Sequence, residues 1–296
     1  MTGLIFSIVR ASVHDGPGIR TVIYHKGCTM RCAWCHNPEG LSPRTEIMYY
    51  PERCIGCGRC AGVCPEHISG GFRLPVCRHC GQCAESCPSG ALSAAGKRYD
   101  ADELMKIILR DRRYYEKSGG GVTFSGGECL MQSDFVAYLA DECKKAGIHT
   151  ALETALYVGE AALDAVIGKI DLFYVDLKHM DPGKHKKFTG CDNRLILSNF
   201  RRLSARHDNI IVRIPLIPGV NDDETNLHDT ARFIADCRGG VRAVELLKYN
   251  ELAGGKYAPL GLDIRPSEAW RAQTDAQMIE KRAFMRSQLP ENIEVI

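Results

Sequence analysis

Residues 27–37 read Gly27-Cys28-Thr29-Met30-Arg31-Cys32-Ala33-Trp34-Cys35-His36-Asn37, and this stretch places three thiols at C-x3-C-x2-C spacing. Three cysteine thiolates can hold a [4Fe–4S] cluster through three of its four irons. The fourth iron then stays open to another ligand. The spacing therefore predicts a fold that surrounds a cluster with one vacant coordination position, and it predicts that the chemistry takes place at that position.

Eight more cysteines follow in two runs, each with the spacing C-x2-C-x2-C-x3-C-P of the bacterial two-cluster ferredoxins. In that arrangement, the fourth cysteine of each run binds the cluster of the other run. The spacing predicts one auxiliary [4Fe–4S] cluster on Cys54, Cys57, Cys60 and Cys87, and a second on Cys64, Cys77, Cys80 and Cys83. The four other thiols, Cys129, Cys143, Cys191 and Cys237, are scattered, and we expect them to be buried or idle.

Zinc and haem are the alternatives for these cysteines. Zinc knuckles use two separated C-x2-C pairs, whereas each run here has three cysteines at equal spacing and a fourth before proline, which favours iron and sulfur. Residues 32–36 also match the C-x-x-C-H haem attachment pattern. Covalent haem attachment usually follows export, no export signal is seen, and haem would leave Cys28 unexplained.

Length, composition and charge restrict the class of protein. The 296 residues suit one large domain or a domain with a small insert, and 45% hydrophobic content is ordinary for a globular protein. A formal net charge of +2 argues against a nucleic-acid partner. The apolar stretch 4–9 is too short for a signal peptide or a membrane span. We therefore expect a cytoplasmic protein without a membrane partner, in which thiols stay reduced and bind metal.

Strand-like and helical patterns alternate from residue 119 onward, which predicts parallel strands joined by helices. The predicted strands are 4–9, 21–24, 121–125, 148–153, 172–178, 210–216, 243–248 and 292–296, and the predicted helices are 101–117, 133–146, 159–168, 193–206, 222–237 and 267–287. The fold class is α/β, a partial TIM-like (β/α) barrel formed by residues 1–50 and 93–296. Residues 51–92 form a ferredoxin-like insert whose folding energy would come from its two clusters.

Several motifs together resemble the radical S-adenosylmethionine (SAM) enzymes, and among them the activating enzymes of glycyl radical enzymes. The C-x3-C-x2-C run, with an aromatic residue before its last cysteine, is similar to the radical SAM signature. The accompanying motifs are His14-Asp15-Gly16-Pro17-Gly18-Ile19-Arg20-Thr21, Cys35-His36-Asn37-Pro38, Ser125-Gly126-Gly127-Glu128, Asp176-Leu177-Lys178 and Tyr249-Asn250. The two-cluster insert resembles the longer activating enzymes, such as those of glycerol dehydratase and related eliminases.

This resemblance implies the activity. The enzyme would reductively cleave SAM to a 5′-deoxyadenosyl radical, which abstracts hydrogen from a glycine of a partner glycyl radical enzyme. Three [4Fe–4S] clusters and SAM are the implied cofactors, with a flavodoxin or ferredoxin as electron donor. The auxiliary clusters would relay electrons, help to dock the partner, or only hold the insert together. Two other classes stay open: a radical SAM oxidoreductase acting on a small molecule or peptide, and an electron-transfer iron–sulfur protein.

The predicted strand 172–178 has polar residues on one face. Tyr174, Asp176 and Lys178 share that face, while the alternating positions are apolar. Charges that point into a barrel are costly unless they meet each other or a ligand. An Asp–Lys ion pair at a solvated rim would explain them, and so would a SAM site. Arg213 repeats the pattern on the next predicted strand and could face the SAM carboxylate.

The resemblance also implies a set of contact residues. The SAM cluster would be held by Cys28, Cys32 and Cys35, and SAM would be bound by Trp34, Cys35, His36, Gly126, Gly127, Glu128, Thr154, Asp176, Leu177, Lys178, Arg213 and Asn250. Asp15 would accept hydrogen bonds from the partner's glycine segment.

The chain departs from the family pattern at three places. It has Lys248-Tyr249-Asn250 where proline, an aromatic residue and histidine are usual. The nucleoside would then be contacted by the Asn250 amide, which cannot titrate. It has Glu153-Thr154 in place of Asp-Thr, which bears on a cation site beside SAM. Cys129 also follows Gly-Gly-Glu where proline is usual.

Overall fold

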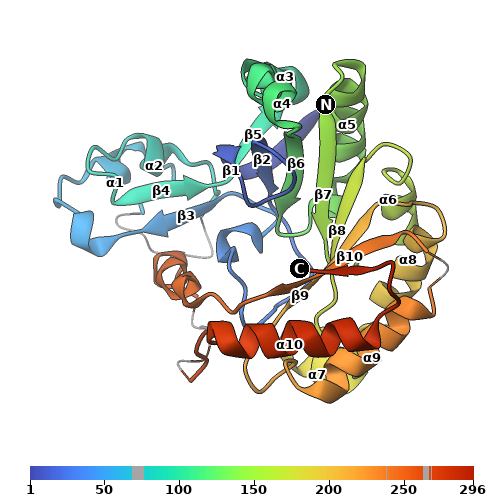
Figure 1. Ribbon diagram of the computed structural model, residues 1–296. Coiled ribbons are helices and arrows are strands. Elements are labelled where there is room, and N and C mark those ends of the chain that lie inside the picture. Colours follow the sequence, from blue (N-terminus) through green and yellow to red (C-terminus); the bar gives the residue numbers. More distant parts are fainter. Residues whose placement is uncertain (69–76, 238, 263–266, 268) are drawn as a thin grey trace.

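A nine-stranded sheet forms the centre of the computed structural model, which describes residues 1–68, 77–237, 239–262, 267 and 269–296. Its strands lie in the order β11-β10-β9-β8-β7-β6-β2-β1-β5 (Figure 1). Their bounds are β1 Thr2–Ser12, β2 Arg20–His25, β5 Lys97–Asp100, β6 Gly121–Gly126, β7 His149–Thr154, β8 Leu172–Asp176, β9 Ile210–Pro215, β10 Val241–Leu247 and β11 Glu294–Val295. The order is linear, with β11 and β5 at its two edges, so the sheet does not close into a full barrel.

Strands β2 and β6 to β11 are parallel, and only β1 and β5 are added antiparallel at one edge of the sheet. Parallel strands need crossover connections, which the intervening helices provide. The α/β fold and the partial barrel predicted from the sequence are confirmed. Strand β5 was not predicted, because its four residues carry no apolar alternation and gain their order from pairing with β1.

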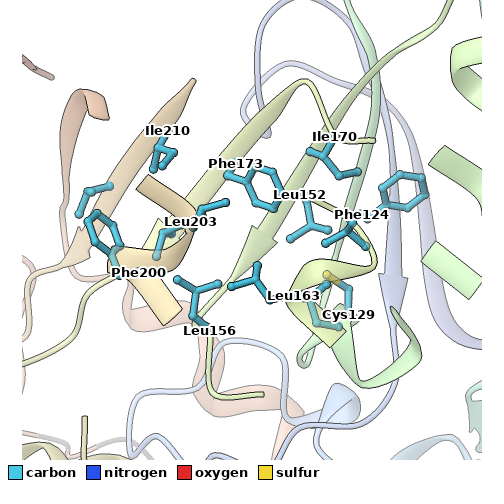
Figure 2. Packing of buried hydrophobic residues seen from close by; sticks show 14 of the residues in the cluster. Phe124, Cys129, Leu152, Leu156, Leu163, Ile170, Phe173, Phe200, Leu203 and Ile210 are labelled. Carbon is cyan, nitrogen blue, oxygen red and sulfur yellow. The ribbon is translucent and has the colours of Figure 1, made fainter. Parts of the chain in front are cut away.

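The helices that follow the strands cover the outer face of the sheet (Figure 1). They are α3 Ala101–Arg110, α4 Arg112–Ser118, α5 Ser133–Lys145, α6 Glu160–Asp164, α7 Pro182–Thr189, α8 Arg194–Ser204, α9 Glu224–Ala235 and α10 Asp275–Gln288. The main hydrophobic core lies between these helices and the sheet. Figure 2 shows Phe124, Leu152 and Phe173 of successive strands meeting Leu163 and Phe200 of the covering helices.

Two predicted helices differ from the observed ones. The predicted helix 101–117 is divided into α3 and α4 at Asp111, whose carboxylate accepts hydrogen bonds from Arg10 and from the hydroxyl of Thr21 on β2. The helix predicted to begin at residue 267 begins at Asp275, where Thr274 forms a capping box with Gln277. Part of the predicted range, residue 268, lies outside the described residues. Helix α7 was not predicted.

The cysteine-rich insert has a small sheet of its own. Strands β3 Glu46–Tyr49 and β4 Leu92–Ala95 pair antiparallel at its base, and the short helices α1 Arg59–Val63 and α2 Gln82–Glu85 lie beyond them (Figure 1). The Lys26 ammonium, which directly precedes the three-cysteine stretch, forms an ion pair with Glu46 at 3.1 Å. The base of the insert is therefore tied to the barrel. The domain bounds 51–92 stay a prediction.

Candidate active site

A cavity of about 260 Å³ opens at the carboxyl ends of the parallel strands. This is the end at which barrel enzymes place their active sites. Of the predicted residues, it is lined by Cys28, Cys32, Trp34, Cys35, His36, Gly126, Gly127, Thr154, Asp176, Lys178, Arg213 and Asn250. Glu128, Leu177 and Asp15 do not line it. The fold thus brings together residues from β6 to β10 with the three-cysteine stretch.

The three-cysteine stretch is held by backbone hydrogen bonds on two sides. The Gly27 N–H donates to the Gly40 carbonyl at 2.8 Å, which closes the stretch into a loop. The amides of Arg31 and Ala33 donate to the carbonyls of Thr189 and Phe188 at the end of α7, at 2.7 and 2.9 Å. These bonds fix the loop without using its side chains, so all three thiols are left to face the cavity.

The chemistry of this donor set fits an iron–sulfur cluster. Burial raises the pKa of the Cys28 and Cys32 thiols to about 12 and that of Cys35 to about 11. Thiolates in such surroundings require nearby positive charge, which bound irons supply. Lys178 is a second source, because its charge acts to lower the pKa of each of the three thiols.

Glycines let β6 approach the cysteine loop closely. A Cβ on Gly126, whose φ is +130°, would come within 2.2 Å of the His25 carbonyl oxygen. A Cβ on Gly127 would come within 2.4 Å of the Gly40 carbonyl and 2.5 Å of the Gly27 carbonyl. No side chain fits at either position, so the Gly-Gly sequence is required for this backbone contact.

Strand β8 has the alternation predicted from its sequence. Phe173, Val175 and Leu177 lie in the outer core, which explains why Leu177 does not reach the cavity. The Lys178 ammonium lies 2.7 Å from the Asp176 carboxylate, and both residues line the cavity. Burial acts to lower the pKa of Lys178, but Asp176 and the Cys32 thiol outweigh it and leave that pKa raised. Lys178 therefore stays charged.

Arg213 is held between two carboxylates. Its guanidinium pairs with Glu153 of β7 and, at 2.7 Å, with Glu245 of β10, and it lies over the Tyr174 ring at 3.8 Å. Desolvation acts to lower the pKa of Arg213, and the two carboxylates reverse that effect and raise it. The guanidinium thus reaches the cavity already oriented. The Ser125 hydroxyl donates to Glu153 at 2.5 Å and completes this polar layer.

The predicted direct contact of Glu128 with SAM is not supported by the structure. Its side chain is 3% exposed and turns away from the cavity. Its carboxylate accepts hydrogen bonds from the Thr154 hydroxyl at 2.8 and 2.9 Å and from the Ala155 N–H at 3.0 Å, and it caps the turn η3 (Cys129–Gln132). Glu128 therefore orients the end of β7, which carries Thr154 into the cavity.

We expect Glu128 to titrate near neutral pH. Burial raises its pKa from the ordinary 4.5 to about 7, while the hydrogen bond from Thr154 acts in the opposite direction. Because the folded-state pKa is higher than the unfolded-state value, folding takes up a proton between these two pH values, and this group lowers stability as pH rises from about 4.5 to about 7. A protonated-carboxyl infrared band should disappear with a midpoint near pH 7 and should be absent from Glu128→Gln. A band already lost at pH 5 would contradict the expectation.

The loop before β2 depends on a residue to which the sequence analysis gave no role. Arg20 is fully buried and donates to the Thr123 hydroxyl at 2.7 Å and to the Pro17 carbonyl at 3.1 Å. The Thr123 hydroxyl in turn donates to the backbone carbonyl of Asp15 at 2.7 Å. The Asp15 carboxylate accepts from Ser12. A charged residue directly before the predicted strand 21–24 was the available signal.

Aromatic rings form one wall of the cavity. Trp34 and Tyr249 are both nearly buried, and each lies edge-to-face with Trp270 at 6.2 and 5.9 Å between ring centroids. The Tyr249 N–H donates to the Gln273 side chain at 3.0 Å. Asn250 follows Tyr249 directly and lines the cavity. The apolar wall with an adjacent amide is suited to a nucleoside.

Two smaller hollows in the insert divide its cysteines into two sets. One, of about 170 Å³, is lined by Cys54, Cys57, Cys60 and Cys87, and the other, of about 20 Å³, by Cys64, Cys77, Cys80 and Cys83. These are the two crossed sets predicted from the spacing. Within the described part of the chain, no three Cys, His, Asp or Glu side chains converge on a single ion position. Of the four scattered thiols, three are buried and Cys237 is half-buried.

Comparison with known proteins places the chain in a family. Residues 63–231 match the model of the Radical SAM superfamily, and residues 47–68 match that of the 4Fe-4S binding domain. The first span begins after the three-cysteine loop, so the assignment of that loop depends on spacing and geometry. The fold also resembles spore photoproduct lyase, with a TM-score of 0.54 and 12% identity over 98% of this chain and 79% of that one. The chain belongs to the radical SAM superfamily.

Curated relatives narrow the assignment. The chain is 44% identical to the (2S)-3-sulfopropanediol dehydratase activating enzyme of Klebsiella oxytoca, over 88% of this chain and 86% of the relative. It is 39% identical to the choline trimethylamine-lyase activating enzyme of Oleidesulfovibrio alaskensis, over 96% and 94%. It is also 39% identical to the trans-4-hydroxy-L-proline dehydratase activating enzyme of Clostridioides difficile, over 97% of both. Within the superfamily, the chain is an activating enzyme of glycyl radical enzymes.

This membership confirms the predicted activity and its main cofactors, a [4Fe–4S] cluster and SAM. One electron supplied by the reduced cluster cleaves SAM to methionine and a 5′-deoxyadenosyl radical. That radical takes a hydrogen atom from a glycine of the partner, giving 5′-deoxyadenosine and a glycyl radical. In the part of the chain that the structure describes, no helix has the length and apolar character to cross a bilayer.

Proposed function

We propose that this activating enzyme holds three [4Fe–4S] clusters. The observation that carries the proposal is the division of the insert's cysteines between two hollows. Each hollow gathers three cysteines of one run and the fourth of the other, as two-cluster ferredoxins do. Cys54, Cys57, Cys60 and Cys87 would bind one auxiliary cluster, and Cys64, Cys77, Cys80 and Cys83 the other.

The SAM cluster would bind Cys28, Cys32 and Cys35, with SAM at the open iron. Lys178 and Arg213 are two of the cationic side chains that line the cavity, and they would hold the methionyl carboxylate. Asp176 and the backbone at Gly126 and Gly127 would accept from its ammonium group. Trp34, His36 and Asn250 would bind the nucleoside. Thr154 would contribute its backbone, because Glu128 holds its hydroxyl.

The auxiliary clusters would form an electron relay with a defined order. Ile47 lines the hollow of Cys64 and Cys83, while Tyr49, two residues farther along β3, lines the other. Glu46, the first residue of β3, is paired with Lys26 of the barrel. Along β3 from this ion pair, the hollow lined by Ile47 comes first and the hollow lined by Tyr49 comes second. We therefore call the first hollow proximal to the barrel and the second distal. The distal hollow has two exposed cysteines, Cys54 and Cys57, whereas the proximal hollow has one, Cys80. A flavodoxin or ferredoxin would deliver electrons to the distal hollow, in a cytoplasmic enzyme.

Paired substitutions test the ligand assignment. The wild type, purified and reconstituted without oxygen, should contain about twelve irons per chain. Cys57→Ala with Cys87→Ala removes two ligands of one cluster in the crossed arrangement, so about eight irons should remain and the other auxiliary signal should be unchanged. The matched pair Cys57→Ala with Cys64→Ala should disturb both auxiliary signals.

The reverse pattern would show that each run binds its own cluster. About four irons in the wild type would contradict both auxiliary clusters. Cys143→Ala is the control, because this thiol is buried in α5 away from the hollows, and its iron content should equal that of the wild type.

A further inference from the structure

The segment after β10 lies against the three-cysteine loop. It comprises the turn η4 (Glu251–Lys256), Tyr257 and the turn η5 (Ala258–Leu260). The segment begins directly after Asn250 at the cavity, and it meets the residues that follow the last cysteine of the loop. We name it the Tyr257 segment. None of its residues is among the predicted site residues.

Tyr257 contacts the backbone of a predicted cluster ligand. Its hydroxyl donates to the Cys35 carbonyl at 2.7 Å, and the residue is 1% exposed. A hydroxyl buried to this extent costs free energy unless it is hydrogen-bonded, so the contact is maintained. The Tyr257 carbonyl accepts from the amides of Leu260 and Leu262 at 3.0 and 3.1 Å, which fixes the residue from which the side chain extends.

Lys256 holds the same loop from its surface. Its ammonium donates to the His36 carbonyl at 3.2 Å and pairs with Glu39 at 2.8 Å. Two consecutive residues of the Tyr257 segment therefore bind two consecutive carbonyls, those of Cys35 and His36. The backbone bonds described above hold the beginning and middle of the loop, whereas its last ligand has this separate support.

The Tyr257 segment also reaches the base of the insert, because η5 lies against β3. Strand β3 leads to the hollow lined by Ile47. The segment thus touches both the loop of the SAM cluster and the strand that carries the proximal auxiliary site.

We propose that Tyr257 is a positioning residue for the SAM cluster. It holds Cys35 in the orientation in which its thiolate binds one iron and the open iron stays accessible to SAM. The role rests on the proposed ligation by Cys35. Hydrogen bonds near cluster sulfurs set the reduction potential, and residues outside the ligand set orient the ligands. The hydroxyl dipole at the Cys35 peptide stabilises the negative charge that reduction adds. Its removal should therefore make reduction harder.

Tyr257→Phe tests this role, because it removes the hydroxyl and keeps the ring. The variant should keep the iron content of the wild type. Its SAM-responsive cluster should have a more negative midpoint potential and an altered electron paramagnetic resonance spectrum with SAM bound. Because Tyr257 acts on SAM only through Cys35, the loss of one hydrogen bond of about 1 kcal/mol should raise the KM for SAM by at most roughly fivefold. Tyr138→Phe, on the partly exposed α5 side chain, is the matched control and should equal the wild type.

Lys256→Met provides a second test if Tyr257→Phe does not fold. It loosens the same loop from an exposed position and should shift the potential and the KM in the same direction. The proposal is overturned if the folded variants have the potential, spectrum and KM of the wild type. If the wild type itself has no SAM-responsive cluster, the proposed ligation by Cys28, Cys32 and Cys35 fails instead.

Discussion

Replacing Cys32 with alanine is expected to abolish SAM cleavage while both auxiliary clusters remain. Cys32 is the central thiol of the loop and lines the cavity together with Lys178 and Asp176. Two thiolates cannot retain the cubane that three hold, so the electron donor nearest to SAM is lost. The insert has a separate set of eight thiols, none of which lines this cavity.

The measurement combines iron content with 5′-deoxyadenosine formation under anaerobic reduction. Cys32→Ala should contain about eight irons per chain instead of about twelve, and its spectrum should not respond to SAM. Cys191→Ala is a matched control, because this buried thiol follows α7 beside the loop and does not line the cavity. Cleavage by Cys32→Ala at the wild-type rate would show that the assignment of the open-iron site is wrong.

Replacing Arg213 with methionine is expected to destabilise the protein by about 3 to 5 kcal/mol, the usual cost of removing one partner from a buried ion pair. The Arg213 side chain is 11% exposed and forms ion pairs with both Glu153 and Glu245. Without it, the carboxylates of Glu153 on β7 and Glu245 on β10 remain in the barrel without the guanidinium that pairs with both. The cavity also loses a guanidinium, so SAM should bind more weakly.

Anaerobic thermal unfolding of the holoenzyme measures this effect. Arg202→Met is the matched control, since Arg202 also pairs with two carboxylates, Asp164 and Glu160, but is 38% exposed. Its loss should cost less than about 1 kcal/mol. Adding Glu153→Gln and Glu245→Gln to Arg213→Met should recover part of the stability. Equal unfolding midpoints for Arg213→Met and Arg202→Met would contradict the interpretation.

The site residues that are indicated by the alternation of polar and apolar side chains along a strand, or by cysteine spacing, could be predicted from the sequence. Alternation along β8 placed Asp176 and Lys178 on the cavity face, and the same pattern on the next predicted strand indicated Arg213. The crossed division of the insert's cysteines likewise followed from spacing, because short loops leave few ways to gather four thiols. The parallel direction of the main strands followed from their alternation with helices.

Other features depend on contacts between distant segments and were not predictable. Glu128 was expected in the cavity, but the direction of its side chain is decided by the Thr154 hydroxyl and the Ala155 N–H at the end of β7. Tyr257 meets Cys35 across more than 200 residues of sequence, and no local pattern indicates that contact. Strand β5 is ordered only by its pairing with β1.

The pairing of β3 with β4 has a consequence for how such a protein can change over evolutionary time. Because these two strands run side by side, the chain leaves the barrel and returns to it at neighbouring points. The segment between β3 and β4 can become longer or shorter, or be lost, while the connections between the barrel strands stay the same. A single insertion or deletion between β3 and β4 would therefore add or remove both auxiliary cluster sites, and the barrel would still fold.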